Sequence, residues 1–198
     1  PNRPWGQLSN HIKGYQPLSK IEDKTIVPSI PTKIYLNEED ENSLVAHIPT
    51  KGYVIMHPFA GDAIRINLPI EEYFSIAKLL IKEFDYRVII IGGTSQRVIG
   101  KISRTINEEF PYEADGIVNL INKVNLRVAC SLTLSASHFI GSNSAFYCVR
   151  LGTKKSASIS MPNNPILTPK NILRIRKDGT QYTITRQGKQ LQANKVSK

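Results

Sequence analysis

Cysteine, methionine and tryptophan are scarce in this sequence of 198 residues, which holds two cysteines, two methionines and one tryptophan. Cys130 and Cys148 are too few for a disulfide scaffold and are typical of a reducing compartment. No histidine or acidic residue stands at metal-ligand spacing from either of them. The sequence therefore argues against a small secreted disulfide protein and against a zinc module.

Long hydrophobic runs are also missing. The longest strongly apolar run, residues 88–91, is far shorter than the ~20 residues that a membrane helix needs. With 40% hydrophobic and 21% charged residues, the composition is that of one globular domain or of two small ones. The sequence begins at Pro1 rather than at a methionine, so we expect a processed chain or a piece of a longer one.

Negative charge is nearly absent at the C-terminal end. Residues 170–198 hold eight basic side chains and one acidic side chain, Asp178, so +7 of the formal net charge of +10 lies there. Concentrated positive charge can attract nucleic acid or an anionic lipid surface. The same pattern is also typical of a solvated edge, and both interpretations stay open.

Residues 1–50 are predicted to form an N-terminal segment with one short helix. Five prolines interrupt residues 1–36, and each restricts its predecessor away from helix. Asn37 is a good N-cap, and the helix dipole favours the acidic Glu38, Glu39 and Asp40 in the first turn. The predicted helix ends at about Ile48, before Pro49.

From residue 51 onward, short apolar strands alternate with amphipathic helices. Strands are predicted at residues 53–56, 87–91, 116–120, 138–140 and 155–160, and helices at 70–84, from Thr94 through Ile106, at 125–134 and at 144–151. The strands are apolar throughout, as in parallel sheets buried on both faces. We therefore predict an α/β fold, with a Rossmann-like parallel sheet covered by helices on both faces over residues 51–165.

The basic region 166–198 is predicted to be a β-hairpin and a tail. Residues 173–177 and 181–186 have strand composition, and Asp178-Gly179 between them is a typical hairpin turn.

Ligands of open parallel sheets bind outside the carboxyl ends of the strands, so the loops at residues 57–69, 92–96, 120–125 and 141–145 are the places to examine. The first loop holds small residues beside Arg65, the second a pair of glycines, and the fourth small polar side chains. Each suits a phosphate or a sugar. A surface loop, a tight turn and plain helix capping are the alternatives. His57 is interpreted as structural, since nothing nearby in sequence orients it, and so is His138, since it begins a buried strand.

Five segments of the chain, in this order and spacing, carry a resemblance. They are residues 57–61 continuing through 65–69 to Phe74, Ala77 and Leu80; residues 86–93; residues 118–126; residues 136–145; and residues 151–155. Together, residues 32–160 resemble the C-terminal half of the heptosyltransferase-like (family 9) glycosyltransferases. Three segments depart from the family pattern: Asn143-Ser144-Ala145 replaces Asp-Ser-Gly, Asn122 replaces a glycine, and Gln96 stands where an acidic residue follows the Gly-Gly turn.

The resemblance implies one half of a GT-B fold, which is built from two Rossmann-like halves. It implies a glycosyltransferase that moves a sugar from a nucleotide-diphosphate sugar to a cell-surface glycan or lipopolysaccharide-type acceptor. A helix N-terminus and Arg65, rather than a metal, would stabilise the departing diphosphate, so no cofactor is expected. The donor-binding residues that it implies are Ala60, Gly61, Arg65, Gly93, Thr94, Gln96, Asn122, Ser142, Asn143 and Ser144.

The same resemblance places the catalytic base and the acceptor site in an N-terminal Rossmann domain, present in cis or in trans, so we expect no transfer by this chain alone. The expected location is the cytoplasm, peripheral at the inner membrane if the basic tail binds anionic lipid. The alternative is a non-catalytic Rossmann-like module. It would have lost donor binding and would use the basic tail for a partner or for nucleic acid.

Overall fold

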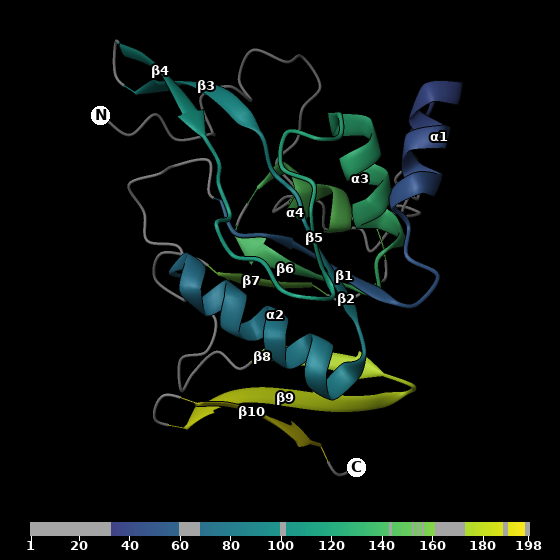
Figure 1. Ribbon diagram of the computed structural model, residues 1–198, viewed down its shortest axis with the longest axis vertical. Coiled ribbons are helices and arrows are strands. Elements are labelled where there is room, and N and C mark those ends of the chain that lie inside the picture. The colour runs from purple at the N-terminus through teal and green to yellow at the C-terminus, as the bar shows by residue number, and fades with distance from the viewer. Residues whose placement is uncertain are drawn as a thin grey trace, which may run out of the picture. The chain divides into compact units, whose positions relative to one another are not determined.

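The computed structural model describes residues 33–59, 68–99, 102–142, 144–151, 153, 155, 157–160, 173–187 and 190–196, and for residues 95–99, 102–107, 159 and 160 the backbone alone. Its centre is a parallel sheet in the order β5-β2-β1-β6-β7 (Figure 1). The strands are β1 (Tyr53–His57), β2 (Arg87–Ile90), β5 (Ile117–Asn119), β6 (His138–Ser142) and β7 (Ala157–Ser160). The predicted Rossmann-like parallel sheet is confirmed.

Helices cover both faces of this sheet, as predicted. They are α1 (Glu38–His47), α2 (Ile70–Phe84), α3 (Leu126–Ser135) and α4 (Ala145–Leu151). Alternate residues of β1 point to opposite faces: Met56 belongs to the core under α2, and Ile55 to the core under α3. In Figure 1, α2 lies on one side of the sheet and α1 and α3 on the other.

The N-cap that the sequence predicts at Asn37 is present in the structure. Asn37 Oδ1 accepts the Asp40 backbone N–H at 2.8 Å, while the Asp40 carboxylate accepts the Asn37 N–H at 3.2 Å, and α1 ends at His47, before Pro49. α3 begins in the same way, because Asn125 Oδ1 accepts the Val128 N–H at 3.0 Å.

The segment after the Gly-Gly turn is a strand pair, so the helix predicted there is wrong. Thr94 begins β3 (Thr94–Ile99), which pairs antiparallel with β4 (Ile102–Asn107). Val98, Ile102 and Ile106 have helical spacing. The segment is nevertheless rich in β-branched residues, and Gly-Lys between the two strands is a composition that favours a two-residue hairpin connection. In this segment, strand propensity and turn composition outweigh the helical spacing of the apolar residues.

The predicted C-terminal hairpin is confirmed and has a third strand. β8 (Leu173–Lys177), β9 (Thr180–Gln187) and β10 (Gln190–Lys195) form an antiparallel sheet in the order β10-β9-β8. Asp178 and Gly179 have φ of 49° and 75°, as a two-residue turn between right-twisted strands requires.

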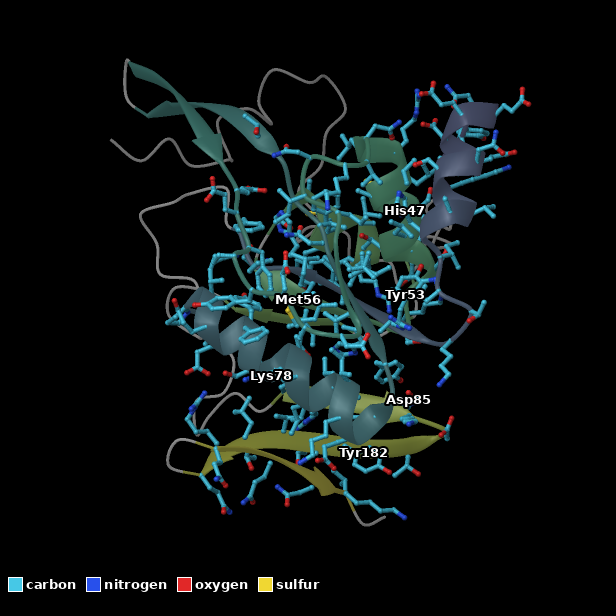
Figure 2. The ribbon with its side chains drawn as sticks, in the orientation of Figure 1. His47, Tyr53, Met56, Lys78, Asp85 and Tyr182 are labelled. Atoms are coloured by element: carbon cyan, nitrogen blue, oxygen red, sulfur yellow. The ribbon has the colours of Figure 1, made fainter. Side chains whose placement is uncertain are left out.

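This small sheet packs against α2. Leu173, Ile175 and Ile184 are fully or almost fully buried in the same core as the inner face of α2. The ring of Phe84, at the end of α2, meets Tyr182 edge-on with 4.9 Å between centroids, and Figure 2 shows Tyr182 beside that end of the helix. The predicted basic hairpin thus completes the core.

Candidate ligand-binding site

A cavity of about 610 Å³ opens at the carboxyl edge of the central sheet, on the face that α3 and α4 cover. It is lined by His57, Gly92, Gly93, Thr94, Glu108, Asn122, Val124, Asn125, Leu126, Ala129, Ser144, Ala145 and Phe146. The chain runs from β1 outward to β2 and β5, and then returns to β6 on the other side of β1. The ends of β1 and β6 are therefore the switch point of the sheet, where open α/β folds bind ligands.

Four of the residues predicted to bind a donor line this one cavity: Gly93, Thr94, Asn122 and Ser144. Ser142 is fully buried behind it, and its hydroxyl donates to the Phe59 carbonyl. Gln96 lies in β3, of which the backbone is described. Ala60, Gly61, Arg65 and Asn143 lie outside the described residues. The binding roles of all ten residues stay predictions.

Asn122 ties two of the cavity loops together. Its side-chain oxygen accepts the Thr94 N–H at 2.7 Å, and its backbone N–H donates to the Gly92 carbonyl at 3.2 Å. Its φ is 58°, in the left-handed region that glycine and asparagine tolerate best. The backbone conformation thus explains why asparagine can occupy a position at which the resembled family has glycine.

Glu108 is a cavity residue that the sequence reasoning missed. The carboxylate follows β4 and accepts the Gly93 N–H at 2.8 Å, so the β3–β4 hairpin returns an acidic side chain to the Gly-Gly turn. The family pattern places its acidic residue directly after that turn, where this chain has Gln96. No local motif marks Glu108, because the sequence pattern predicts a helix in place of the hairpin that brings it back.

His57 occupies the end of β1 in the same cavity. Its Nε2 lies 3.8 Å from Glu108 Oε2, and the two side chains are 7% and 10% exposed. The imidazole meets the rings of Phe59 and Phe146 edge-on, with centroids 5.6 Å and 4.8 Å away. The interpretation that nothing orients His57 is correct only for its sequence neighbours, since its partner lies 51 positions further along the chain.

The start of α3 is fixed at the rim of the cavity by α1. The Asn125 side chain donates to Asp40 Oδ1 at 2.5 Å, and Arg127 Nε lies 2.7 Å from Asp40 Oδ2. The hydrogen bond from Asn125, followed by that from the Asn37 N–H and the contacts with Arg127, lowers the pKa of Asp40. Asp40 therefore links the first turns of both helices as a carboxylate.

The cavity combines few polar groups with an apolar wall. Val124, Leu126, Ala129 and Phe146 supply apolar surface, and Glu108 supplies acceptor oxygens for hydroxyl groups. The Ser144 hydroxyl is buried and has no hydrogen-bond partner among the described residues. This composition is typical of sites for organic ligands that carry hydroxyl groups. Within the described chain, no group of three or more His, Cys, Asp or Glu residues is placed to hold a metal ion.

No protein-family model and no curated protein matches the sequence. The solved structures that are similar to it include three of glycosyltransferases. The iron-containing dodecameric glycosyltransferase TibC from enterotoxigenic E. coli is 20% identical over 67% of this chain and 34% of its own, with a TM-score of 0.42. A second structure of TibC, in complex with ADP-D-beta-D-heptose, is 20% identical over 67% of this chain and 33% of its own, with a TM-score of 0.42.

The third structure is E. coli ADP-heptose lipopolysaccharide heptosyltransferase II, which is 14% identical over 73% of this chain and 46% of its own, with a TM-score of 0.49. The chain spans less than half the length of each of these proteins. The helices that are described here include none long and apolar enough to span a membrane.

Proposed function

We propose that this chain is the donor-binding half of a glycosyltransferase and that the cavity at the switch point takes a nucleotide-diphosphate sugar. One observation carries the proposal: Gly93, Thr94, Asn122 and Ser144, which the motifs predict as donor-binding residues on three separate loops, line one cavity at the carboxyl edge. The transferred sugar would go to a cell-surface glycan or lipopolysaccharide-type acceptor.

In this proposal each group in the cavity has a chemical task. The apolar wall around Phe146 packs against a flat or hydrophobic part of the donor, and the Glu108 carboxylate accepts hydrogen bonds from its hydroxyl groups. The Ser144 hydroxyl donates to an oxygen of the ligand. Arg65 remains the predicted diphosphate contact, from the loop that follows β1.

The proposed reaction is attack of an acceptor hydroxyl on the anomeric carbon of the donor, with the nucleoside diphosphate as leaving group. The described cavity residues hold the donor, and a second Rossmann domain, in cis or in trans, supplies the acceptor site and the base that takes the hydroxyl proton. No metal and no other cofactor enters this scheme.

The alternative of a non-catalytic module acting through its basic tail has less support. Two of the basic side chains in the C-terminal sheet serve the fold: the Lys177 ammonium donates to the Phe84 carbonyl, and Arg186 pairs with Glu72 of α2. They are therefore less available to an anionic partner than the sequence suggests.

A thermal-shift titration with nucleoside diphosphates and nucleotide sugars tests the proposal. A ligand at one hundred times its Kd should raise the Tm of a domain of this size by about 5–10 °C. The replacement Ser144→Ala should weaken binding about three- to tenfold, because one hydrogen bond to the ligand is lost. Ser75→Ala is the matched control, since that hydroxyl bonds to the Glu71 carbonyl on α2, outside the cavity. If no member of the panel protects the chain, the non-catalytic module is favoured.

A further inference from the structure

His57 and Glu108 are a buried titratable pair in the wall of the cavity. Of the described residues that line it, these two alone carry acidic or basic side chains, and they come from different elements, the end of β1 and the segment after β4. Their facing atoms, His57 Nε2 and Glu108 Oε2, are 3.8 Å apart, close enough for an ion pair once the imidazole is protonated.

The second ring nitrogen of His57, Nδ1, makes no hydrogen bond to the described residues. Nδ1 is buried, while the neighbouring rings of Phe59 and Phe146 approach the imidazole edge-on. Buried polar atoms almost always have a partner, so this nitrogen in the cavity wall is open to a hydrogen bond with a ligand.

The charged side chains of the cavity indicate which kind of ligand group would bond to His57 Nδ1. His57 is the one lining residue among those described that can become a cation, and the Glu108 carboxylate lies beside it. Imidazole is the side chain that changes charge most readily near neutral pH, and an anion beside it favours the charged form.

We propose that a diphosphate ligand binds to this cavity together with one proton, which His57 takes up. The proton comes from the solvent and adds to the imidazole, and no other covalent bond changes. The resulting imidazolium donates one N–H toward the Glu108 carboxylate and the other to a phosphoryl oxygen. The inference rests on the proposed function, and it makes His57 a phosphate-binding residue whose charge depends on Glu108.

Calorimetry on the full chain tests this inference. UDP-glucose, ADP-glucose and GDP-mannose are suitable probes, because their diphosphates are esterified at both ends and keep a constant charge between about pH 5.5 and 8. Titrations in two buffers of different ionisation enthalpy count the protons taken up. We expect a net uptake of protons on binding for the unchanged chain, and none for His57→Gln.

The binding affinity should also depend on pH through His57. His57→Gln should weaken binding about tenfold at about pH 6, with little pH dependence left, since one charge-assisted hydrogen bond is lost. Glu108→Gln should move the proton uptake to lower pH, because the imidazolium loses its anionic partner. His47→Gln, on α1 and outside the cavity, is the matched control and should change neither quantity.

A measurement on the unchanged chain tests the inference even if the His57 variant does not fold. With ¹⁵N-labelled histidine, the His57 ring signals should move to imidazolium positions when the probe is added, and those of His47 should stay. Binding without proton uptake, or uptake that survives in His57→Gln, would overturn the inference and leave the donor-binding proposal intact. If none of the probes binds, the proposed function fails, and this inference fails with it.

Discussion

Arg150 is the largest fully buried side chain among the described residues, and it closes the end of α3. Its guanidinium donates to four backbone carbonyls at distances between 2.9 and 3.3 Å, those of Thr133, Leu134, Ala136 and Ser137. The carbonyls of Thr133 and Leu134 belong to the last turn of α3, which carries the negative end of the helix dipole, so a cation is favourable there. Burial lowers the pKa of Arg150 to about 10, which leaves it charged at neutral pH.

Replacing this guanidinium should therefore be costly. Arg150→Met keeps the volume of the side chain but removes the guanidinium donor from the carbonyls of Thr133, Ala136 and Ser137, and we expect a loss of about 3 kcal/mol in the free energy of unfolding. Arg174→Met, an exposed position on β8, should change it by less than about 0.5 kcal/mol. Urea denaturation followed by circular dichroism measures both, and equal losses would contradict the role given to Arg150.

His138, at the start of β6, makes stability depend on pH. Burial, together with the charge of Arg150, lowers its pKa from the ordinary 6.5 to about 3, and its Nε2 lies 3.0 Å from the Ser158 hydroxyl. The unfolded chain takes up a proton at His138 below pH 6.5 and the folded chain does not, so this contribution is complete above pH 6.5 and falls as the pH is lowered toward 3.

Between about pH 6.5 and 4.5 this histidine should remove about 2–3 kcal/mol of stability. His138→Gln carries no such titration, so its free energy of unfolding should fall less steeply over that range, whatever its stability at neutral pH. Denaturant unfolding at several pH values gives the two slopes. Parallel slopes would show that His138 titrates alike in the folded and unfolded chains.

Among the elements, α1 and α3 depend on each other through one asparagine. Asn125 caps α3 with its side-chain oxygen and donates from its side-chain nitrogen to Asp40, which belongs to the capping box of α1. A single side chain thus satisfies donors and acceptors at two helix starts.

Asn125→Ala should cost about 2 kcal/mol, since both the cap and a hydrogen bond to a carboxylate are lost. Asn125→Ser should recover about half of that, because serine caps the helix but cannot reach Asp40 in the same way. Thermal unfolding checks the order of the three chains. A serine variant as unstable as the alanine variant would mean that the link to α1 dominates.

The β3–β4 hairpin is the element that decides the character of the site. It occupies the position at which alternation of strands and helices predicts a crossover helix, and it brings Glu108 back to Gly93. A helix from Thr94 onward would have left the Gly-Gly turn without this carboxylate and His57 without a charged neighbour. Whether residues 94–107 form a helix or a strand pair therefore determines whether a carboxylate lies in the cavity.

At the scale of the whole molecule, the C-terminal sheet is part of the core. A chain that ends at residue 165 would lose Leu173, Ile175 and Ile184, which are each worth about 1.5–3 kcal/mol when fully buried. That sum rivals the whole stability of a typical domain, so we expect no cooperative thermal transition and strong binding of the dye ANS.

Truncation after Gln187 is the matched comparison, because it removes β10, whose Leu191 and Ala193 are only partly buried. That chain should keep a cooperative transition at a lower Tm. If the chain ending at residue 165 unfolds as cooperatively as the full chain, the C-terminal sheet is an appendage rather than part of the core.

The sequence by itself determined the parallel sheet, the three longer helices and the C-terminal hairpin. These follow from signals within a few residues of one another: apolar runs, helical spacing, the cap Asn37, and the Asp178-Gly179 turn. It also placed Gly93, Thr94, Asn122 and Ser144 at the correct edge of the sheet, because the carboxyl ends of parallel strands share one edge.

Only the tertiary structure decided which side chains meet in the cavity. The pairing of His57 with Glu108 joins residues 51 positions apart and depends on the return of β4, which no local pattern specifies. The choice of strands over a helix at residues 94–107 and the third strand β10 depend in the same way on pairing partners. Hydrogen bonds between strands and contacts across a cavity form between distant segments, so their energies are absent from any short window of sequence.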